Sequence, residues 1–488
     1  MLFNTIDFVV FFIILLATIT IIKNKKFQHL FLLFASYFFF YYSSNYLILL
    51  LIISTVLDFY VAREIWNTKD VTKKKILLII SLAGNLGLLG FFKYADFAVL
   101  QFNILGNYFN FANDIPFLNL ALPIGISFYT FQTISYTVDV YRGNLQPSKS
   151  FREFALFVTF FPQLVAGPIV RAVDFLPQLR EKMQVGGNSL KQILIHNSNL
   201  KLGITIMSFG FLKKMFFADN IAPIVNDIFA YPIGQDSFVI ILGTIAFGIQ
   251  IYCDFSGYSD IAIGAALILG FKIRKNFNKP YFAISPSDFW NKWHISLSSW
   301  LRDYLYIPLG GNRKSSIRTY VNLSTVMFLG GLWHGASWNF VIWGLMHGMY
   351  LSVHKIISDR FPVLQNHKFF SSKIGKIISI FIMQYFVFLA WIPFRVNDLD
   401  YALYSMSKFV FLDFKIESLE PIFMANKIPI ALILLFVVLH YISYTKPNIV
   451  EKISKLGLVS WGTIIGIILT VIVFFYDGNP ADFIYFKF

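Results

Sequence analysis

The chain has 488 residues, of which 57% are hydrophobic and 14% charged, and its formal net charge is +15. Soluble globular domains are usually about 45–50% apolar and about 25% charged, so this composition excludes an ordinary soluble protein. The apolar residues form long runs, such as residues 8–22 and 429–442, and this pattern predicts a multi-pass membrane protein.

The expected fold is an all-α bundle, because lipid offers no partners to the backbone groups of an open sheet. At about 20 residues per span, the length allows about 10–12 crossings. We expect one integral-membrane domain over residues 1–488, since no linker separates a second domain. The excess of Lys and Arg is typical of cytoplasmic loops, so the expected surroundings are the lipid bilayer and not nucleic acid. The single cysteine, Cys253, excludes an internal disulfide.

Several apolar segments in the first half of the chain read as spans. Residues 8–22 read as a retained anchor, since no small-residue cleavage site follows them. Residues 30–42 and 46–62 are expected to form a helical hairpin. Residues 160–182 contain three prolines and a glycine, and are too broken for a plain span. We interpret them as a re-entrant or interfacial segment, which is tolerated only where protein covers it.

Residues 239–271 form a long apolar stretch that carries polar side chains. They include Asp254, Ser256, Tyr258 and Asp260, and Gly257 is able to break the helix. Intramembrane carboxylates indicate a water-filled cavity or a proton path, although a polar kink that bonds internally fits equally. A transporter is an alternative here, but no inverted repeat or second broken segment accompanies it.

Residues 285–306 predict one amphipathic helix on the cytoplasmic side. Ser285, Pro286 and Asp288 have the spacing of a capping-box start. Trp293 falls on the apolar face of the helix, Asn291 and Arg302 on the polar face, and His294 at the margin of the apolar face. The segment could equally be a plain surface helix with no chemical role.

His334 lies in the apolar stretch "FLGGLWHGASWNF" (residues 328–340). Gly331 with Gly335, and Gly344 with Gly348, form two small-xxx-small pairs that let helices approach closely. Ionisable groups at membrane depth are costly and usually functional, and a neutral histidine can act as a general base near pH 7. A structural histidine bonded to a carbonyl is one alternative. A haem ligand is another, but beyond His347 only His440 offers a partner in an apolar segment.

The motifs as a group resemble the membrane-bound O-acyltransferase (MBOAT) family, in its alginate O-acetyltransferase membrane-subunit branch. The resemblance is carried by "FFPQLVAGPIVR", "DFSGYSDIAIGAALILGF", "FWNKWHISLSSWLRDYLYIPLGGNR" and "GLWHGASWNFVIWGLMHG", with the early "STVLDFYVARE" and the terminal "FIYFKF". It implies a bundle of tilted helices around a tunnel that opens to both membrane faces. It also implies that His334 is the catalytic histidine and His294 a second functional residue near the cytoplasmic mouth.

The resemblance further implies the reaction. An acyl group, expected to be acetyl, would pass from acyl-CoA or an acyl-carrier thioester to a hydroxyl at the outer face of the cell membrane, on a polysaccharide or peptidoglycan. No bound cofactor or metal is expected, whereas a separate outer-face transferase is expected as a partner. Export of D-alanyl groups, as in the D-alanyl transfer protein, is the alternative within the family. Direct attack by the acceptor and a relay through an acyl-enzyme both fit this reaction, and direct attack is favoured because no nucleophile other than Ser337 lies beside His334 in sequence.

Further residues near these motifs are candidates for substrate contacts. A basic rim would attract the anionic donor, with Lys292, Arg302, Arg313, Lys314 and Arg318 as its members. The predicted substrate-binding set comprises Asp254, Ser256, Tyr258, Asp260, Asn291, Trp293, Arg302, Trp333 and Ser337.

Overall fold

The computed structural model describes residues 1–22, 24–110, 114–164, 167–184, 197–362, 367–415, 419–476, 478 and 481–487. These residues form helices and their connections, and none of them lies in a strand, which confirms the all-α class. The chain divides into two compact units, Met1–Met207 with Ile261–Arg274, and Ser208–Asp260 with Lys275–Phe488. The single domain over residues 1–488 stays a prediction.

Among the described residues, six helical segments are long and apolar enough to cross a membrane, which confirms a multi-pass membrane protein. The segments are Lys25–Asn67, Val71–Phe109, Ser237–Ile268, Trp338–Arg360, Lys373–Arg395 and Lys427–Thr445. Two shorter apolar helices, Ile6–Ile21 and Leu458–Phe474, accompany them. The expected number of about 10–12 crossings stays a prediction.

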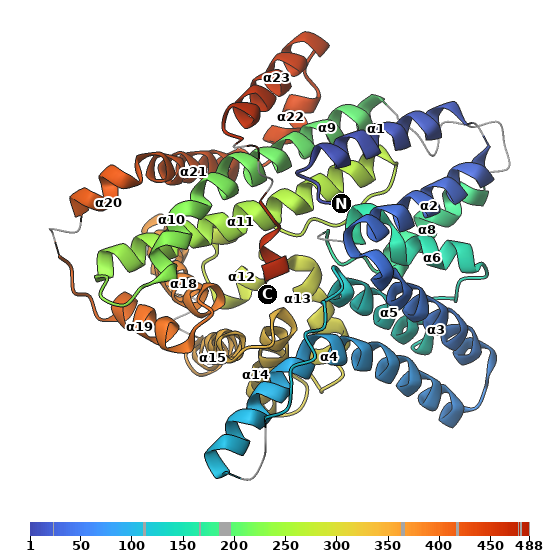
Figure 1. Cartoon of the computed structure of the whole chain (residues 1–488), viewed down its shortest axis with the longest axis horizontal. Helices are drawn as coiled ribbons and strands as arrows, with labels where there is room; N and C mark the ends of the chain where they lie inside the picture. Colours follow the sequence, from blue (N-terminus) through green and yellow to red (C-terminus); the bar gives the residue numbers. More distant parts are fainter. Residues whose placement is uncertain are drawn as a thin grey trace. The chain divides into compact units, whose positions relative to one another are not determined.

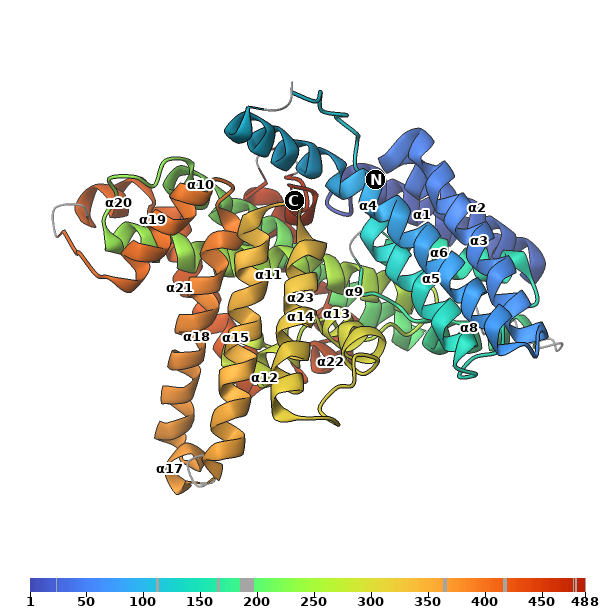
Figure 2. The same cartoon turned by 90° about the horizontal axis from the view of Figure 1, so that it is seen from below.

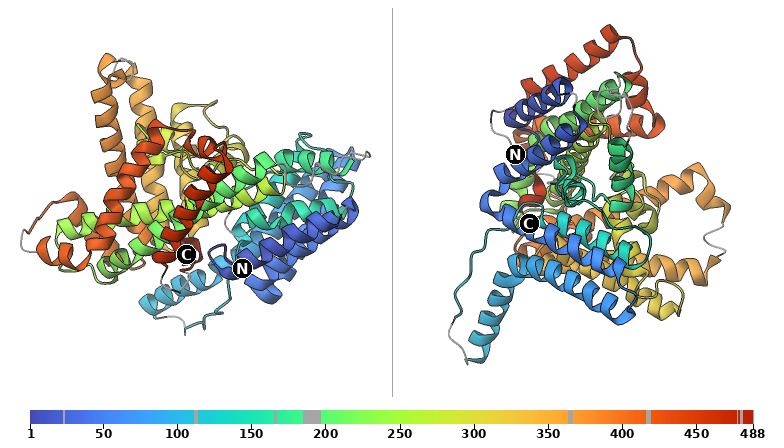
Figure 3. Two further views of the ribbon diagram at one scale, coloured as in Figure 1. Left: turned by 90° about the horizontal axis from the view of Figure 1, so that it is seen from above. Right: turned by 90° about the vertical axis from the view of Figure 1, so that its right-hand side faces the viewer.

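The first unit is built from the N-terminal helices, shown from blue to teal in Figures 1 and 3. They are α1 (Ile6–Ile21), α2 (Lys25–Ser44), α3 (Ile48–Asn67), α4 (Val71–Phe109), α5 (Ile126–Tyr141), α6 (Phe151–Thr159), α7 (Phe161–Leu164) and α8 (Ala172–Gln184). The chain turns between α2 and α3 at Asn45, whose φ is +48°, as the predicted hairpin requires. Buried Asp58 of α3 joins its neighbours by accepting hydrogen bonds from Asn85 of α4 (2.7 Å) and Thr137 of α5 (2.8 Å).

The segment that the sequence analysis placed at 160–182 is not one helix. The short helix α7 is separated from α8 by non-helical residues that include 167–171. The four residues of α7 are buried within this unit. This agrees with a segment too broken for a plain span, while its re-entrant or interfacial position stays a prediction.

The second unit carries the residues of chemical interest. Its helices are α10 (Asp219–Ala230), α12 (Pro286–Trp290), α13 (Ile295–Leu301), α14 (Ser316–His334), α15 (Trp338–Arg360), α17 (Lys368–Ser371), α18 (Lys373–Arg395), α19 (Leu399–Val410), α20 (Leu419–Ala425), α21 (Lys427–Thr445), α22 (Ile449–Ser454) and α23 (Leu458–Phe474). Helices α9 (Asn197–Phe211) and α11 (Ser237–Ile268) contribute residues to both units. Figure 2 shows α14, α15 and α18 running side by side.

One local prediction in this unit is wrong, and one possible break does not occur. Residues 285–306 do not form one helix, because α12 ends at Trp290 and α13 begins at Ile295. Gly257 does not break α11, which runs without interruption from Ser237 to Ile268. A Cβ at Gly257 would lie 2.8 Å from the carbonyl oxygen of Gly210, so this glycine permits close packing of α9 against α11.

The predicted close approach at the paired glycines is confirmed for α14 and α15. A Cβ at Gly331 would lie 2.2 Å from the carbonyl oxygen of Phe340, and one at Gly344 would lie 2.4 Å from that of Met327. Both obstacles are backbone atoms, which cannot rotate away as a side chain can. The two helices therefore touch along their backbones, as small residues allow in membrane proteins.

We expect Gly344→Ala to destabilise the protein by on the order of 1–3 kcal/mol, because the added methyl group forces the two backbones apart. The matched control is Gly466→Ala in α23, where a Cβ meets nothing within 4 Å. There the change should be neutral or stabilising by about 0.5–1 kcal/mol, since alanine is the better helix former. Thermal unfolding of the purified variants measures both effects, and equal melting temperatures would contradict the close packing.

Candidate active site

His334 is the last residue of α14, and the chain turns directly after it. The turn needs glycine at position 335, because a Cβ there would lie 2.1 Å from the Phe340 ring. The His334 side chain is only 4% exposed. Ring centroids of Trp343, Phe394 and Tyr485 lie 4.9, 5.1 and 5.4 Å from its imidazole. His334 is thus an ionisable ring enclosed by aromatic side chains from α15, α18 and the C-terminal segment.

His294 occupies the break between α12 and α13. Its φ is +41°, a left-handed conformation that is uncommon for residues other than glycine. The buried Asn276 fixes the break: its carbonyl oxygen accepts from the Ile295 N–H (2.9 Å), and its Oδ1 accepts from the Ser296 N–H (3.2 Å) and hydroxyl (2.8 Å). Backbone strain of this kind often marks functional sites.

The break turns the His294 ring inward, where it is 0% exposed. The ring packs edge-on against Phe255, with centroids 4.6 Å apart. Within the described ranges, neither ring nitrogen has a hydrogen-bond partner. Burial lowers the pKa of His294 to about 3, so the imidazole is neutral at physiological pH and offers one N–H donor and one acceptor.

The two histidines pack against the same two aromatic side chains, Trp333 and Tyr485. Trp333 lies 6.0 Å from His294 and 5.0 Å from His334, measured between ring centroids. Tyr485 lies 6.4 Å from His294 and 5.4 Å from His334. We call His294, His334, Trp333, Tyr485 and Phe255 the histidine cluster. It combines a few polar atoms with apolar walls, as binding sites for small substrates usually do.

The polar residues of α11 are held by two lysines of the π-helical turn η2 (Leu212–Ala218). Lys214 Nζ lies 2.9 Å from the carboxylate of Asp254, and its ammonium lies 5.7 Å from the centre of the Tyr258 ring. Lys213 donates to Ser256 (2.9 Å) and Asp260 (2.6 Å). These four predicted substrate-binding residues thus have contacts within the protein, which agrees with the alternative of a polar stretch that bonds internally.

The remaining predicted site residues contact other partners. Arg302 and Asn291 are exposed, and Arg302 pairs with Asp303 (2.7 Å). Trp293 packs in the core on Trp391 and Phe277 at 4.9 and 5.0 Å between ring centroids. Ser337 is the N-cap of α15, where its hydroxyl accepts from the Asn339 N–H. Their roles in substrate binding stay predictions.

Sequence reasoning missed four residues of this region. Tyr485 lies in the terminal "FIYFKF", which was used only as a mark of resemblance, and Phe255 lies in "DFSGYSD". Lys214 could have been found, because two successive lysines interrupt the apolar residues 202–217. Asn276 gives no signal in a single sequence, since its role depends on contacts with residues distant in the chain.

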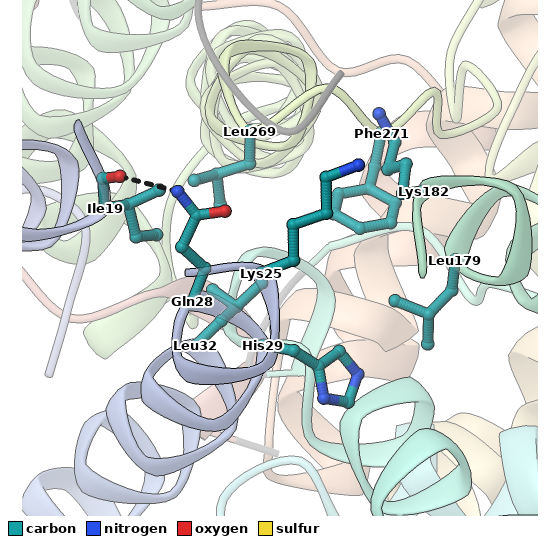
Figure 4. A pocket seen from close by; sticks show the side chains of 9 residues that line it. All are labelled: Ile19, Lys25, Gln28, His29, Leu32, Leu179, Lys182, Leu269 and Phe271. Atoms are coloured by element: carbon teal, nitrogen blue, oxygen red, sulfur yellow. Dashed lines mark hydrogen bonds between the residues drawn. The ribbon is translucent and has the colours of Figure 1, made fainter. Parts of the chain in front are cut away.

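A small cavity in the first unit also gathers basic residues. Lys25, His29 and Lys182 line it together with apolar side chains, and Figure 4 shows Gln28 beside them donating to the carbonyl oxygen of Ile19. Its volume is about 20 Å³, which accommodates about one water molecule. A substrate larger than a water molecule does not fit this cavity.

Comparison with known proteins decides the family. The model of the MBOAT, or membrane-bound O-acyltransferase, family matches residues 144–392. The chain belongs to this family. Both His294 and His334 lie inside the matched region. The resemblance predicted from the motifs is thereby confirmed, together with the class of enzyme, a membrane-bound O-acyltransferase.

Curated relatives of this MBOAT protein are acyltransferases by name. It is 38% identical to a peptidoglycan O-acetyltransferase of Helicobacter pylori over 72% of this chain and 67% of that protein. It is 41% identical to a probable alginate O-acetylase, AlgI, of Azotobacter vinelandii over 67% of this chain and 61% of the relative. Similarity to the teichoic acid D-alanyltransferase of Bacillus subtilis is lower, 28% over 48% of this chain and 60% of the relative.

These matches do not extend over the whole of either partner. The MBOAT chain spans about three fifths of the alginate and teichoic acid relatives just described. The names of these relatives therefore do not establish its substrates or its partners.

The depressed pKa of His294 predicts a dependence of stability on pH. The folded value of about 3 lies below the ordinary value of about 6.5, so the stabilising contribution is present above pH 6.5 and is lost as the pH falls toward 3. Relative to His294→Gln, the wild type should lose about 2 kcal/mol of stability between pH 8 and pH 5. Melting curves of both proteins across this range measure the difference, and a constant difference would contradict burial of the ring.

Proposed function

We propose that this protein transfers an acetyl group from a cytoplasmic thioester donor to a hydroxyl at the outer face of the cell membrane, in peptidoglycan or another envelope polysaccharide. Family membership and the names of the relatives support acyl transfer and an envelope acceptor. The observation that carries the proposal is that two buried histidines of the family-matched region pack against the same side chain, Trp333.

In the proposed reaction His334 is the general base. Its neutral imidazole takes the proton of the acceptor hydroxyl while that oxygen attacks the carbonyl carbon of the thioester. The carbon–sulfur bond then breaks, and the departing thiolate takes the proton back from the His334 imidazolium. The product is an ester and a free thiol, so protons and electrons balance. Aromatic walls exclude water and reduce hydrolysis of the thioester.

His294 supplies the second polar function. A neutral imidazole can donate its N–H to the oxyanion that forms on the thioester carbonyl, and such a donor is worth more in a site that excludes water. The depressed pKa of His294 keeps the ring neutral, so it donates a hydrogen bond without placing a full positive charge beside the base.

The sequence argument for direct attack was that no nucleophile other than Ser337 lies beside His334, and the Ser337 hydroxyl caps α15. The C-terminal segment brings a second hydroxyl close to the proposed base, that of Tyr485. The phenol ring of Tyr485 lies 5.4 Å from the His334 ring. Direct attack and a relay through a protein hydroxyl therefore both fit. Donor supplied without acceptor discriminates them, because only a relay leaves an acetyl group on the protein, which peptide mass spectrometry would locate.

Donor and partners are proposed on chemical grounds. Lys314, Arg313 and Arg318 are exposed basic residues close together in sequence, and such a group attracts the phosphates of acyl-CoA or the acidic surface of an acyl carrier. A separate outer-face transferase would pass the acetyl group to the polymer. D-alanyl transfer is the second candidate function, supported by the similarity to the Bacillus subtilis enzyme. A transporter has no support from the family match.

We expect His334→Ala to lower acetyl transfer by about 10²–10⁴-fold, the usual contribution of a general base. The measurement is release of free thiol and transfer of label from radiolabelled acetyl-CoA by protein in nanodiscs, with an outer-face acceptor. His294→Ala should lower turnover by about 10²-fold or more, as loss of an oxyanion donor does.

The control is His367→Ala, at an exposed histidine outside the cluster, which should leave turnover unchanged. Wild-type turnover in His334→Ala would remove that residue from the mechanism. If acetyl-CoA is inert, acetyl-carrier and D-alanyl-carrier donors are supplied in turn. Turnover with the D-alanyl donor alone would replace the proposed function by the second candidate.

A further inference from the structure

The C-terminal segment reaches the histidine cluster from the far end of the sequence. It is described from Ala481 and ends in the short 3-10 turn η6 (Ile484–Lys487). Figure 1 shows it in red beside α11. Its Tyr485 ring packs close to both histidines. Measured between ring centroids, it lies 4.5 Å from Phe255, which packs on His294, and 5.4 Å from His334. Such a short turn does not hold its position by its own hydrogen bonds, so other contacts must fix it.

Two polar contacts attach this segment to a buried ion cluster. The Ile484 N–H donates to Oδ2 of Asp254 at 2.7 Å, and Lys214 Nζ donates to the Asp482 carbonyl oxygen at 3.2 Å. Hydrogen bonds to charged groups are about twice as strong as neutral ones. Asp482 is three residues before Tyr485 and Ile484 directly precedes it. These two attachments therefore restrict where the Tyr485 ring can lie.

The ion cluster itself is built to hold these groups in place. Lys214 is 1% exposed and Asp254 2% exposed, and Lys214 Nζ also lies 2.8 Å from Asp219 Oδ1. Charged groups taken out of water need several partners in good geometry, and here the backbone of the C-terminal segment supplies two of them. The π-helical turn η2 presents Lys214 to this cluster and Lys213 to Ser256 and Asp260. Wide turns of this type are frequent at functional sites.

Apolar contacts reinforce the same arrangement. The Phe483 ring lies 4.5 Å from that of Tyr258 and 5.6 Å from that of Phe255. These two rings belong to the same stretch of α11 as Asp254. One short stretch of α11 therefore contacts three consecutive residues of the C-terminal segment, through a carboxylate and two rings.

We propose that Lys214 and Asp254 are positioning residues, which anchor the C-terminal segment and so hold Tyr485 against His294 and His334. The proposal rests on the proposed function, because the reaction is assigned to the histidine cluster. It assigns Asp254 to the positioning of a protein segment in place of substrate binding. Neither residue touches the substrate; both act through the backbone of residues 482–484.

The decisive variant is Ile484→Pro. Proline removes the N–H that Asp254 accepts, is tolerated at the first position of a helical turn, and leaves the Lys214–Asp254 pair intact. Lys214→Met and Asp254→Asn remove the charges, and Lys214→Arg is the conservative variant expected to retain at least half of the wild-type turnover. Lys408→Gln is the matched control, because Lys408 pairs with Asp413 in the same unit and this ion pair involves no residue of the C-terminal segment.

Two measurements on protein in nanodiscs test the proposal. Amide hydrogen exchange of the C-terminal peptide should be at least tenfold faster in Ile484→Pro, Lys214→Met and Asp254→Asn, while peptides of α14 and α15 keep their wild-type rates. Turnover should fall at least tenfold with the KM for acetyl-CoA changing less than twofold. Lys408→Gln should change neither the exchange nor the turnover.

The outcomes separate this proposal from the proposed function. Lost turnover with unchanged exchange of the C-terminal peptide would overturn the anchoring role, and faster exchange with full turnover would overturn the link to the histidine cluster. If Lys214→Met fails to fold, Ile484→Pro gives the answer alone. If wild-type protein transfers no acyl group from any donor, the proposed function fails, and the exchange measurement still decides whether Lys214 and Asp254 anchor the segment.

Discussion

The backbone contact between α14 and α15 is the constraint on which the site depends. Gly331 and Gly344 allow the two helices to touch where any side chain would strike a carbonyl group. Burial from water gains little inside a bilayer, so helices there associate through such close van der Waals contact. The short turn after His334 follows from this approach, and it places the imidazole where Trp343 of α15 and Phe394 of α18 can enclose it.

His294 reaches the cluster by a different route, which is the interruption of a helix. A left-handed residue other than glycine costs roughly 1–2 kcal/mol. The bonds from Ile295 and Ser296 to Asn276 each contribute about 1 kcal/mol, which offsets that cost. A continuous helix through residues 291–294 would direct the ring elsewhere, because the direction of a helical side chain is set by its position in the turn. The local strain therefore serves to aim one side chain.

Most of the fold and part of the candidate site could be predicted from the sequence. Long apolar runs marked the helices, the spaced glycines marked the α14–α15 contact, and the capping box at Ser285 is present, with its hydroxyl accepting from the Asp288 N–H at 3.1 Å. Periodicity also placed Trp293 correctly on the buried face, where it is 1% exposed. It could not reveal the break at His294, because the competing partner is Asn276, outside the periodic segment. Tyr485 was hidden for a related reason: a single sequence does not record contacts between residues far apart in the chain.

Hydrogen-bond partners distinguish the buried polar groups around the histidine cluster from one another. Asp254, Lys214 and Asn276 are all buried, and each has partners from the protein. His294 is buried to the same degree, yet within the described part of the chain its ring nitrogens have none. An unmet hydrogen bond in an apolar setting costs free energy, and the neighbouring residues show that this fold can supply partners where position matters. The free capacity of the His294 ring is therefore available to a bound group, and a thioester carbonyl, which accepts one hydrogen bond from a neutral donor, has the matching chemistry.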